Sequence, residues 1–185
     1  MVLDIVFGAV LLAVVAALVL LFAMLGELAS RLPEQGSSAQ TVRSREVRPL
    51  EEARLGVEPG TWPTPLAGIS DTAGQSVVLV LSTACSTCGD VAGQLAAELD
   101  AGVGDDMAVV VSTADPQRAE EFLDKYGLRR LRHHVDDKGD WVSREFGVRM
   151  SPTALVFQAG RLQSALVFQD VDALRETVAE PKGVA

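Results

Sequence analysis

The segment SVVLVLSTACSTCGD, residues 76–90, decides the fold because it joins a buried strand to a cysteine pair and the start of a helix. Residues 76–82 form a continuous apolar run rich in valine, which is typical of a strand buried on both faces. Cys85 and Cys88, the only cysteines of the chain, follow with two residues between them. Both are therefore predicted at the carboxyl end of a strand, where chemistry gathers in open α/β sheets.

The position of the pair also predicts how each thiol behaves. A helix N-terminus offers free backbone N–H groups and a positive dipole end, and both stabilise a thiolate. The pKa of Cys85 is therefore expected to fall below the free-cysteine value of about 8.5. Cys88 lies one helical turn further on, within reach of a disulfide to Cys85. The pattern predicts that Cys85 is the nucleophile and Cys88 the resolving thiol.

Downstream of Cys88 the pattern alternates between helix and strand. Helical spacing of Val91, Leu95 and Leu99 predicts a helix. Further elements are predicted as strands at 107–113 and 131–135, helices at 116–127 and 141–148, a turn at 136–141, a hairpin of strands 153–158 and 162–169, and a last helix at 171–180 capped by Asp170. Alternating units predict parallel strands, and the hairpin adds an antiparallel edge. The expected fold class is α/β, with a mixed central sheet flanked by helices.

The N-terminus predicts a membrane anchor. Residues 5–26 contain no charged residue and are long enough to span a bilayer as a helix. A cleaved signal peptide fits less well, because no basic residue precedes the run and the run is longer than a usual signal core. We therefore expect a transmembrane helix at 1–28, a juxtamembrane linker at 29–60 and a globular domain at 61–185. The segment 42–54 is interpreted as a solvated spacer, with a short helix or stalk as the alternative.

Composition narrows the choice of partners. The 185 residues carry a formal charge of −9, and phosphate backbones require basic surfaces, so nucleic acid is not an expected partner. Two cysteines are too few for a disulfide-stapled scaffold. They point to one intramolecular pair or to reactive thiols.

Ser151 and Pro152 stand just before the predicted hairpin, and only proline makes a cis peptide bond inexpensive. A strand, a CxxC pair at the mouth of a helix, and a proline before a hairpin and final helix together resemble the thioredoxin fold. The resemblance covers roughly residues 60–180. It implies that Pro152 is cis and packs beside the cysteines. It also implies that Ser151 offers backbone hydrogen bonds to a bound partner segment.

The stretch between Cys88 and Pro152 is too long for a minimal thioredoxin and leaves room for one more strand and helix. With an N-terminal anchor, the chain looks like the TlpA-type thiol–disulfide reductases. It is especially similar to MauD-type proteins, which assist disulfide maturation of methylamine dehydrogenase. The chain departs from that family at Ala84, where an aromatic is usual, and at Ser86 and Thr87, where proline is common. It also lacks a carboxylate in 76–82, so Ser86 or Thr87 hydroxyls are the expected tuners of the thiolate.

The resemblance implies a protein disulfide oxidoreductase that exchanges a Cys85–Cys88 dithiol or disulfide with partner proteins. It needs no cofactor beyond that pair, and an upstream electron donor of unknown identity would recharge it. The alternative is a catalytically degenerate binding module of the same fold. Flanking arginines favour the cytoplasmic side of the membrane, whereas the resemblance favours the outside, where disulfides persist. We expect a single-pass cell-membrane protein with an extracytoplasmic domain.

Other features have more ordinary interpretations. Structural zinc wants four ligands, and His133 and His134 are neighbours on a strand that point to opposite faces, so no metal site is expected. A peroxidase pattern would place threonine where Ser82 stands. The basic stretch 129–134 is interpreted as a solvated strand edge, with a partner-docking patch as the alternative. Trp62 and Trp141 are expected to pack in the core, although Trp62 is also a candidate for lining the cleft.

Overall fold

The computed structural model describes residues 46–69, 74–102 and 107–179. The predicted membrane span at residues 5–26 and the linker as far as residue 45 lie outside these residues. Within the described ranges, no helix is both long enough and apolar enough to cross a bilayer.

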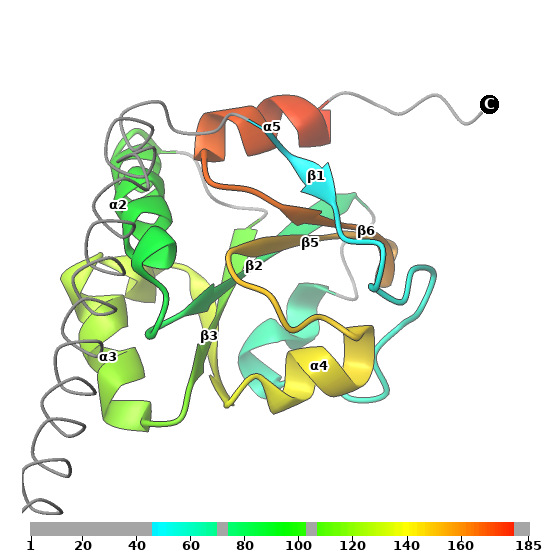
Figure 1. The fold of residues 1–185 in the computed structure, drawn as a ribbon, viewed down its shortest axis with the longest axis horizontal. Helices are drawn as coiled ribbons and strands as arrows, with labels where there is room; N and C mark the ends of the chain where they lie inside the picture. The colour runs from blue at the N-terminus through cyan, green and yellow to red at the C-terminus, as the bar shows by residue number, and fades with distance from the viewer. Residues whose placement is uncertain (1–45, 70–73, 103–106, 180–185) are drawn as a thin grey trace, which may run out of the picture. The chain divides into compact units, whose positions relative to one another are not determined.

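The centre of the domain is a six-stranded mixed sheet with the order β1-β6-β5-β2-β3-β4 (Figure 1). Strands β2, β3 and β4 are parallel, while β5, β6 and β1 continue the sheet in antiparallel pairs. The strands are β1 Arg48–Pro49, β2 Gln75–Ser82, β3 Met107–Thr113, β4 Arg132–Asp137, β5 Thr153–Gln158 and β6 Arg161–Val167. The predicted mixed sheet and its terminal hairpin are confirmed.

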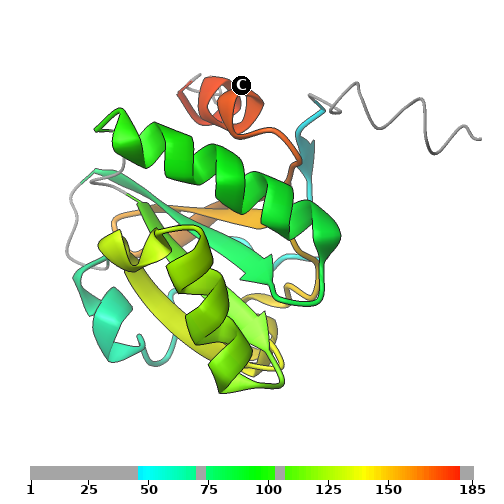
Figure 2. The ribbon, with the colours of Figure 1, turned by 90° about the vertical axis from the view of Figure 1, so that its left-hand side faces the viewer.

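Helices cover both faces of this sheet. They are α2 Ser86–Asp100, α3 Pro116–Lys125, α4 Asp140–Phe146 and α5 Val171–Ala179, with short 3-10 turns η2 Thr64–Ile69 and η3 Leu128–Arg130. Buried residues of α2, α3 and α5 share one apolar cluster, and those of α4 and η2 share another. Figure 2 shows α2, α3 and α5 together on one side of the strands.

Strand β2 contributes side chains to both clusters, because successive side chains of a strand point to opposite faces. Leu79 and Leu81 pack towards α2, whereas Val78 and Val80 pack towards α4. All four are at most 4% exposed. The central strand is therefore buried on both faces, as its apolar run predicts, and its carboxyl end is held rigidly under the cysteine pair.

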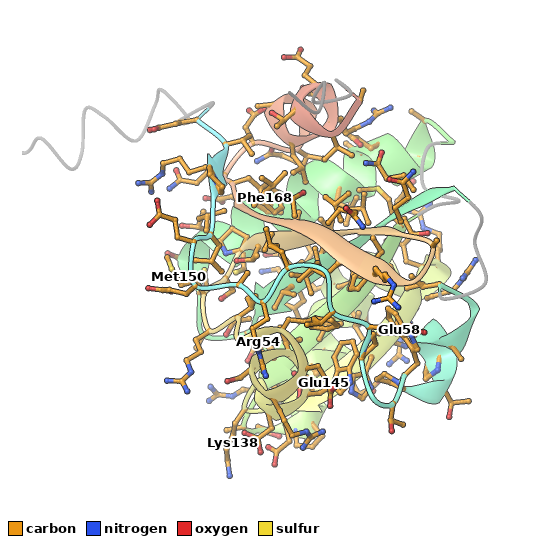
Figure 3. The ribbon with its side chains drawn as sticks, turned by 90° about the vertical axis from the view of Figure 1, so that its right-hand side faces the viewer. Arg54, Glu58, Lys138, Glu145, Met150 and Phe168 are labelled. Carbon is orange, nitrogen blue, oxygen red and sulfur yellow. The ribbon has the colours of Figure 1, made fainter. Side chains whose placement is uncertain are left out.

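Residues 46–60, which the sequence assigns to the linker, pack against the sheet instead. Arg48 and Pro49 pair with β6, and the Leu50 amide donates to the Ala165 carbonyl at 2.8 Å. Arg54 donates to the carbonyl oxygens of Ser143 and Arg144 in α4, and Figure 3 shows it lying against that helix. The spacer interpretation is wrong for this part because its order comes from tertiary pairing, which a short charged segment does not reveal.

Strand β4 also runs further than expected, through Asp136 and Asp137, which the sequence places in a turn. Asp136 is buried, and its carboxylate accepts from the backbone amides of Trp141 at 2.9 Å and Val142 at 3.0 Å. Asp136, the penultimate residue of the strand, therefore satisfies two backbone amides in the first turn of α4. The turn itself uses Lys138 and Gly139, both with positive φ.

Candidate active site

Cys85 lies where the sequence predicts it, between the end of β2 and the first turn of α2. It is the N-cap residue of α2, and its Sγ accepts a hydrogen bond from the Cys88 amide at 3.2 Å. The Cys85 amide in turn donates to the Ser82 carbonyl at 3.3 Å, which fixes the turn between strand and helix. The side chain is half-buried, so the sulfur is positioned by the helix end while part of it faces solvent.

Cys88 lies one turn further along α2 and is 0% exposed. Burial raises the pKa of its thiol from an ordinary value of 9.0 to about 12, and the neighbouring Cys85 adds to the increase. Hydrogen bonds from the Ser82 backbone and the Ser151 side chain act in the opposite direction and lower this pKa. Because the burial effect is the largest, Cys88 is a protonated thiol at neutral pH.

The loop before β5 brings Ser151 and Pro152 to the cysteines. The Ser151–Pro152 peptide bond is cis and Pro152 is buried, as the resemblance implies. The Cys85 thiol donates to the Ser151 carbonyl oxygen at a distance of 3.6 Å from Sγ. The Thr153 hydroxyl donates to the Met150 carbonyl at 2.8 Å and ties the loop to the strand that follows.

Ser86 and Thr87 lie beside the cysteines but do not contact them as expected. Ser86 is exposed and Thr87 is half-buried. Among the described hydrogen bonds, the one that Cys85 Sγ accepts comes from the Cys88 amide, and none comes from either hydroxyl. Tuning of the thiolate by these two residues stays a prediction.

Sequence reasoning missed Met150. Its side chain is 47% exposed, which makes it one of two large apolar side chains in the described residues that face solvent. Figure 3 shows it projecting from the loop into solvent. The signal in the sequence that could have identified Met150 is its position directly before Ser151. Ala84 is also exposed, so a small side chain precedes Cys85 where the resemblance to TlpA-type proteins leads to the expectation of an aromatic ring.

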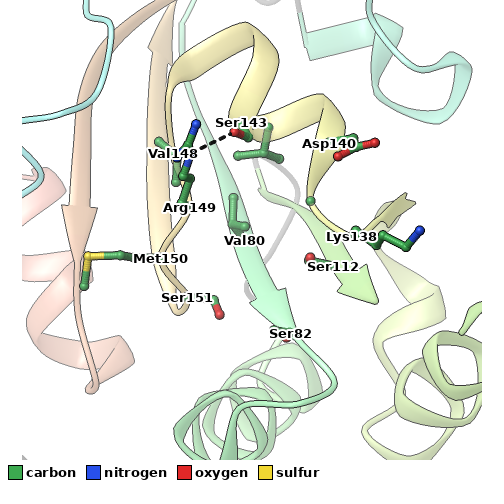
Figure 4. A pocket seen from close by; sticks show the side chains of 12 residues that line it. Val80, Ser82, Ser112, Lys138, Asp140, Ser143, Val148, Arg149, Met150 and Ser151 are labelled. Atoms are coloured by element: carbon green, nitrogen blue, oxygen red, sulfur yellow. Dashed lines mark hydrogen bonds between the residues drawn. The ribbon is translucent and has the colours of Figure 1, made fainter. Parts of the chain in front are cut away.

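A cavity of about 350 Å³ opens next to Ser151, between the ends of β2 and β3 and helix α4 (Figure 4). We call it the Ser151 pocket. Its polar lining consists of four serines and three charged residues, namely Ser82, Ser112, Ser143, Ser151, Lys138, Asp140 and Arg149. Val80, Val142 and Val148 contribute its apolar wall. This pocket was not predicted from the sequence.

The histidines and tryptophans singled out in the sequence take part in packing and backbone contacts. His133 Nδ1 lies 3.0 Å from the Leu131 carbonyl, and the His134 ring packs edge-on against Trp141. Trp141 and Trp62 belong to one aromatic cluster beneath the sheet, with ring centroids 6.0 Å apart. In the described part of the chain, no group of three or more His, Cys, Asp or Glu residues is arranged to hold a metal ion.

The basic stretch is partly neutralised. Arg129 forms ion pairs with Glu120 and Asp124, and Arg130 pairs with Asp100 at 2.8 Å. The arginines are exposed, and such pairs bridge neighbouring elements on the surface. This pairing fits the interpretation as a solvated strand edge better than that of a docking patch.

The sheet order, the cysteine pair at the start of α2 and the loop before β5 define a thioredoxin-like fold. Two solved structures with TM-scores of 0.50 share it. One is Mycobacterium tuberculosis dsbF in its mixed oxidized and reduced forms, with 19% identity over 60% of this chain and 83% of that one. The other is a putative thioredoxin from Neisseria meningitidis, with 16% identity over 69% of this chain and 95% of that one. At these identities the likeness establishes the fold. No family model matches the sequence, and neither does any curated protein.

Proposed function

We propose that this protein is a membrane-tethered thiol–disulfide oxidoreductase of the TlpA type. One observation carries the proposal: half-buried Cys85 caps α2 beside the Ser151 carbonyl, with fully buried Cys88 one turn behind it. A partly exposed nucleophile with a buried second thiol behind it is the arrangement that thiol–disulfide exchange requires. The record of oxidized and reduced forms for the dsbF structure agrees with this chemistry.

The reaction proceeds in two exchanges. Cys85 thiolate attacks one sulfur of a partner disulfide, a mixed disulfide forms, and the other partner sulfur leaves as a thiolate that takes up a proton. Cys88 then loses its proton and attacks Cys85 Sγ. The partner's second sulfur leaves, and Cys85 and Cys88 remain as a disulfide. Two electrons pass from the dithiol to the partner, and the reverse sequence oxidises a partner dithiol.

The neighbouring groups have distinct parts in these steps. The Cys88 amide points at Cys85 Sγ and stabilises the negative charge of the thiolate. The Ser151 carbonyl faces the same sulfur, so a partner segment lying along this loop brings its disulfide to Cys85. Burial keeps Cys88 protonated and out of contact with solvent thiols until the mixed disulfide has formed.

Reduction of insulin by dithiothreitol, with the full-length chain in detergent as catalyst, tests the activity. We expect wild type to accelerate the reaction and Cys85→Ser to abolish the acceleration. In a separate incubation without dithiothreitol, reduced Cys88→Ser should retain a mixed disulfide with insulin that resolves only when external thiol is added. Ser164→Ala, on β6, is the matched control and should behave as wild type. Equal activity of wild type and Cys85→Ser would exclude the oxidoreductase and leave a tethered binding module.

The proposal includes an anchor at residues 5–26 and an extracytoplasmic domain, supplied with electrons by an upstream donor of unknown identity. It rests on the uncharged N-terminal run and on the preference of disulfide chemistry for oxidising compartments. Labelling intact cells with a membrane-impermeant thiol reagent checks it, because Cys85 is half-buried and reachable. We expect Cys85-dependent labelling in intact cells. Labelling only after lysis would place the domain in the cytoplasm.

A further inference from the structure

The Ser151 pocket lies beside the reactive sulfur. Ser151 belongs to both sites. It lines the pocket, and its carbonyl oxygen accepts a hydrogen bond from the Cys85 thiol. A partner held by a bond to Cys85 therefore places the residues next to its cysteine at the mouth of this pocket. What the pocket accepts bears on which partners the protein selects.

Arg149 supplies one of the two positive charges in the pocket lining. Its Nε donates to the Ser143 hydroxyl at 3.3 Å, and Figure 4 shows the side chain pointing towards Ser143 on α4. Among the described residues, no carboxylate forms an ion pair with Arg149, whereas Arg118, Arg129, Arg130, Arg144, Arg161 and Arg175 all have one. The Arg149 guanidinium thus retains donors for a ligand.

The rest of the lining suits an anion with a small polar head. The hydroxyls of Ser82 and Ser112 can each donate one hydrogen bond into the cavity. Lys138 lies across the pocket from Arg149, with Asp140 near it, so the lining contains two cations and one carboxylate. This local excess of positive charge stands in a chain whose formal charge is −9.

We propose that the Ser151 pocket is a carboxylate-binding subsite, and that the preferred partners carry an acidic side chain close to the cysteine that Cys85 attacks. The inference rests on the proposed thiol–disulfide exchange and adds the partner's chemistry. Arg149 is the anchoring residue. The Ser143 hydroxyl holds its guanidinium, and the serine hydroxyls complete the coordination of the carboxylate.

The test compares two synthetic peptide disulfides, identical except for Glu-X-Cys-X-Glu in one and Gln-X-Cys-X-Gln in the other. Side chains two residues apart share a face of an extended segment, so one Glu meets the pocket whichever way the peptide runs. We expect reduced wild type to react about threefold to fivefold faster with the Glu peptide, the size of an exposed ion pair. The preference should shrink at high salt, because exposed charges are screened.

Variants assign the preference to the pocket. Arg149→Gln should bring the ratio of the two rates close to one, and Arg149→Lys should keep part of it. Arg161→Gln is the matched control, because Arg161 is exposed and starts β6 at the hairpin, the opposite end of β5 from the Ser151 loop. It should leave the ratio unchanged.

The possible outcomes separate the subsite from the exchange reaction. A wild-type ratio near one, or a preference that survives in Arg149→Gln, overturns the assignment of acidic peptide partners to this pocket while leaving the exchange reaction intact. A wild type that reacts with neither peptide overturns the proposed function and the subsite with it. The free dicarboxylate 3,3′-dithiodipropionate is the third probe. An Arg149-dependent reaction with it but no preference between peptides would assign the pocket to small disulfide acids and overturn the peptide assignment.

Discussion

Burial of Cys88 predicts an unusual pH dependence for the second exchange step. Its pKa stands at about 12, against an ordinary value of 9.0, and burial is the largest cause. In the mixed disulfide Cys85 is no longer a thiol, so its smaller contribution disappears while burial remains. From pH 8 to pH 10 the thiolate fraction of a thiol with so high a pKa rises close to tenfold per unit, about a hundredfold in all. A thiol with the ordinary value gains only about tenfold over the same interval.

Stopped-flow reaction of the reduced protein with 2,2′-dithiodipyridine measures this step. The reagent is neutral at these pH values, so the charges of the Ser151 pocket do not influence it. Attack by Cys85 releases one pyridinethione, and attack by Cys88 on the mixed disulfide releases the second. We expect the second phase to accelerate about a hundredfold between pH 8 and pH 10, because its rate follows the thiolate fraction.

Two controls define the phases. Cys88→Ser should release a single pyridinethione, and circular dichroism of wild type at pH 10 should match that at pH 8. A second phase that levels off near pH 9 would refute the reasoning, because it would mean that the mixed-disulfide state exposes Cys88 or that another group takes its proton.

Three further outcomes are expected. Ser151→Ala removes a hydroxyl that lowers the Cys88 pKa, so the second phase at pH 8 should slow by about threefold to tenfold, the value of one hydrogen bond, and Ser151→Thr should restore it. Reduced wild type should lose stability relative to Cys88→Ala above pH 9, by roughly 1.4 kcal/mol per pH unit. The reason is that the unfolded chain loses the thiol proton first, whereas the folded chain keeps it until about pH 12. If the free energies of unfolding in urea of the two proteins change equally between pH 8 and pH 10, this expectation is wrong. Asp136→Ala leaves two buried amides unpaired and should cost about 2–4 kcal/mol in urea denaturation, whereas the exposed Asp137→Ala should cost little.

Local signals in the sequence were sufficient for most of the sheet and for the cysteine pair. The apolar run of β2 predicts burial on both faces, and its residues do alternate between the two clusters. The helix predicted to begin at residue 116 is observed as α3, and the Asp115 side chain accepts from the Gln117 amide as an N-cap does. These features depend on residues close together in the chain, so pattern reading finds them.

Features that depend on distant residues were not predictable in the same way. Strand β1 has two residues and takes its place from β6, more than a hundred positions later. The Ser151 pocket gathers serines from the ends of β2 and β3, from α4 and from the loop before β5. A serine at the end of each of two neighbouring parallel strands, Ser82 and Ser112, was the available sign of a polar site at that edge.

The surroundings of Cys88 bear on both the proposed oxidoreductase and its alternative, a binding module of the same fold. On the face of β2 towards Cys88 lie Leu79 and Leu81, so no carboxylate of that strand takes the thiol proton. The groups that lower its pKa are the Ser82 backbone and the Ser151 side chain, and burial outweighs both. In the proposed reaction the second exchange is then slow at neutral pH, and a partner is expected to stay bonded to Cys85 for longer than in a site with a proton acceptor. Trapping by Cys88→Ser should consequently exceed that of wild type only modestly at pH 7 and much more at pH 9. A slowly turning oxidoreductase with these residues holds its partner as a binding module does, and the pH dependence of release distinguishes them.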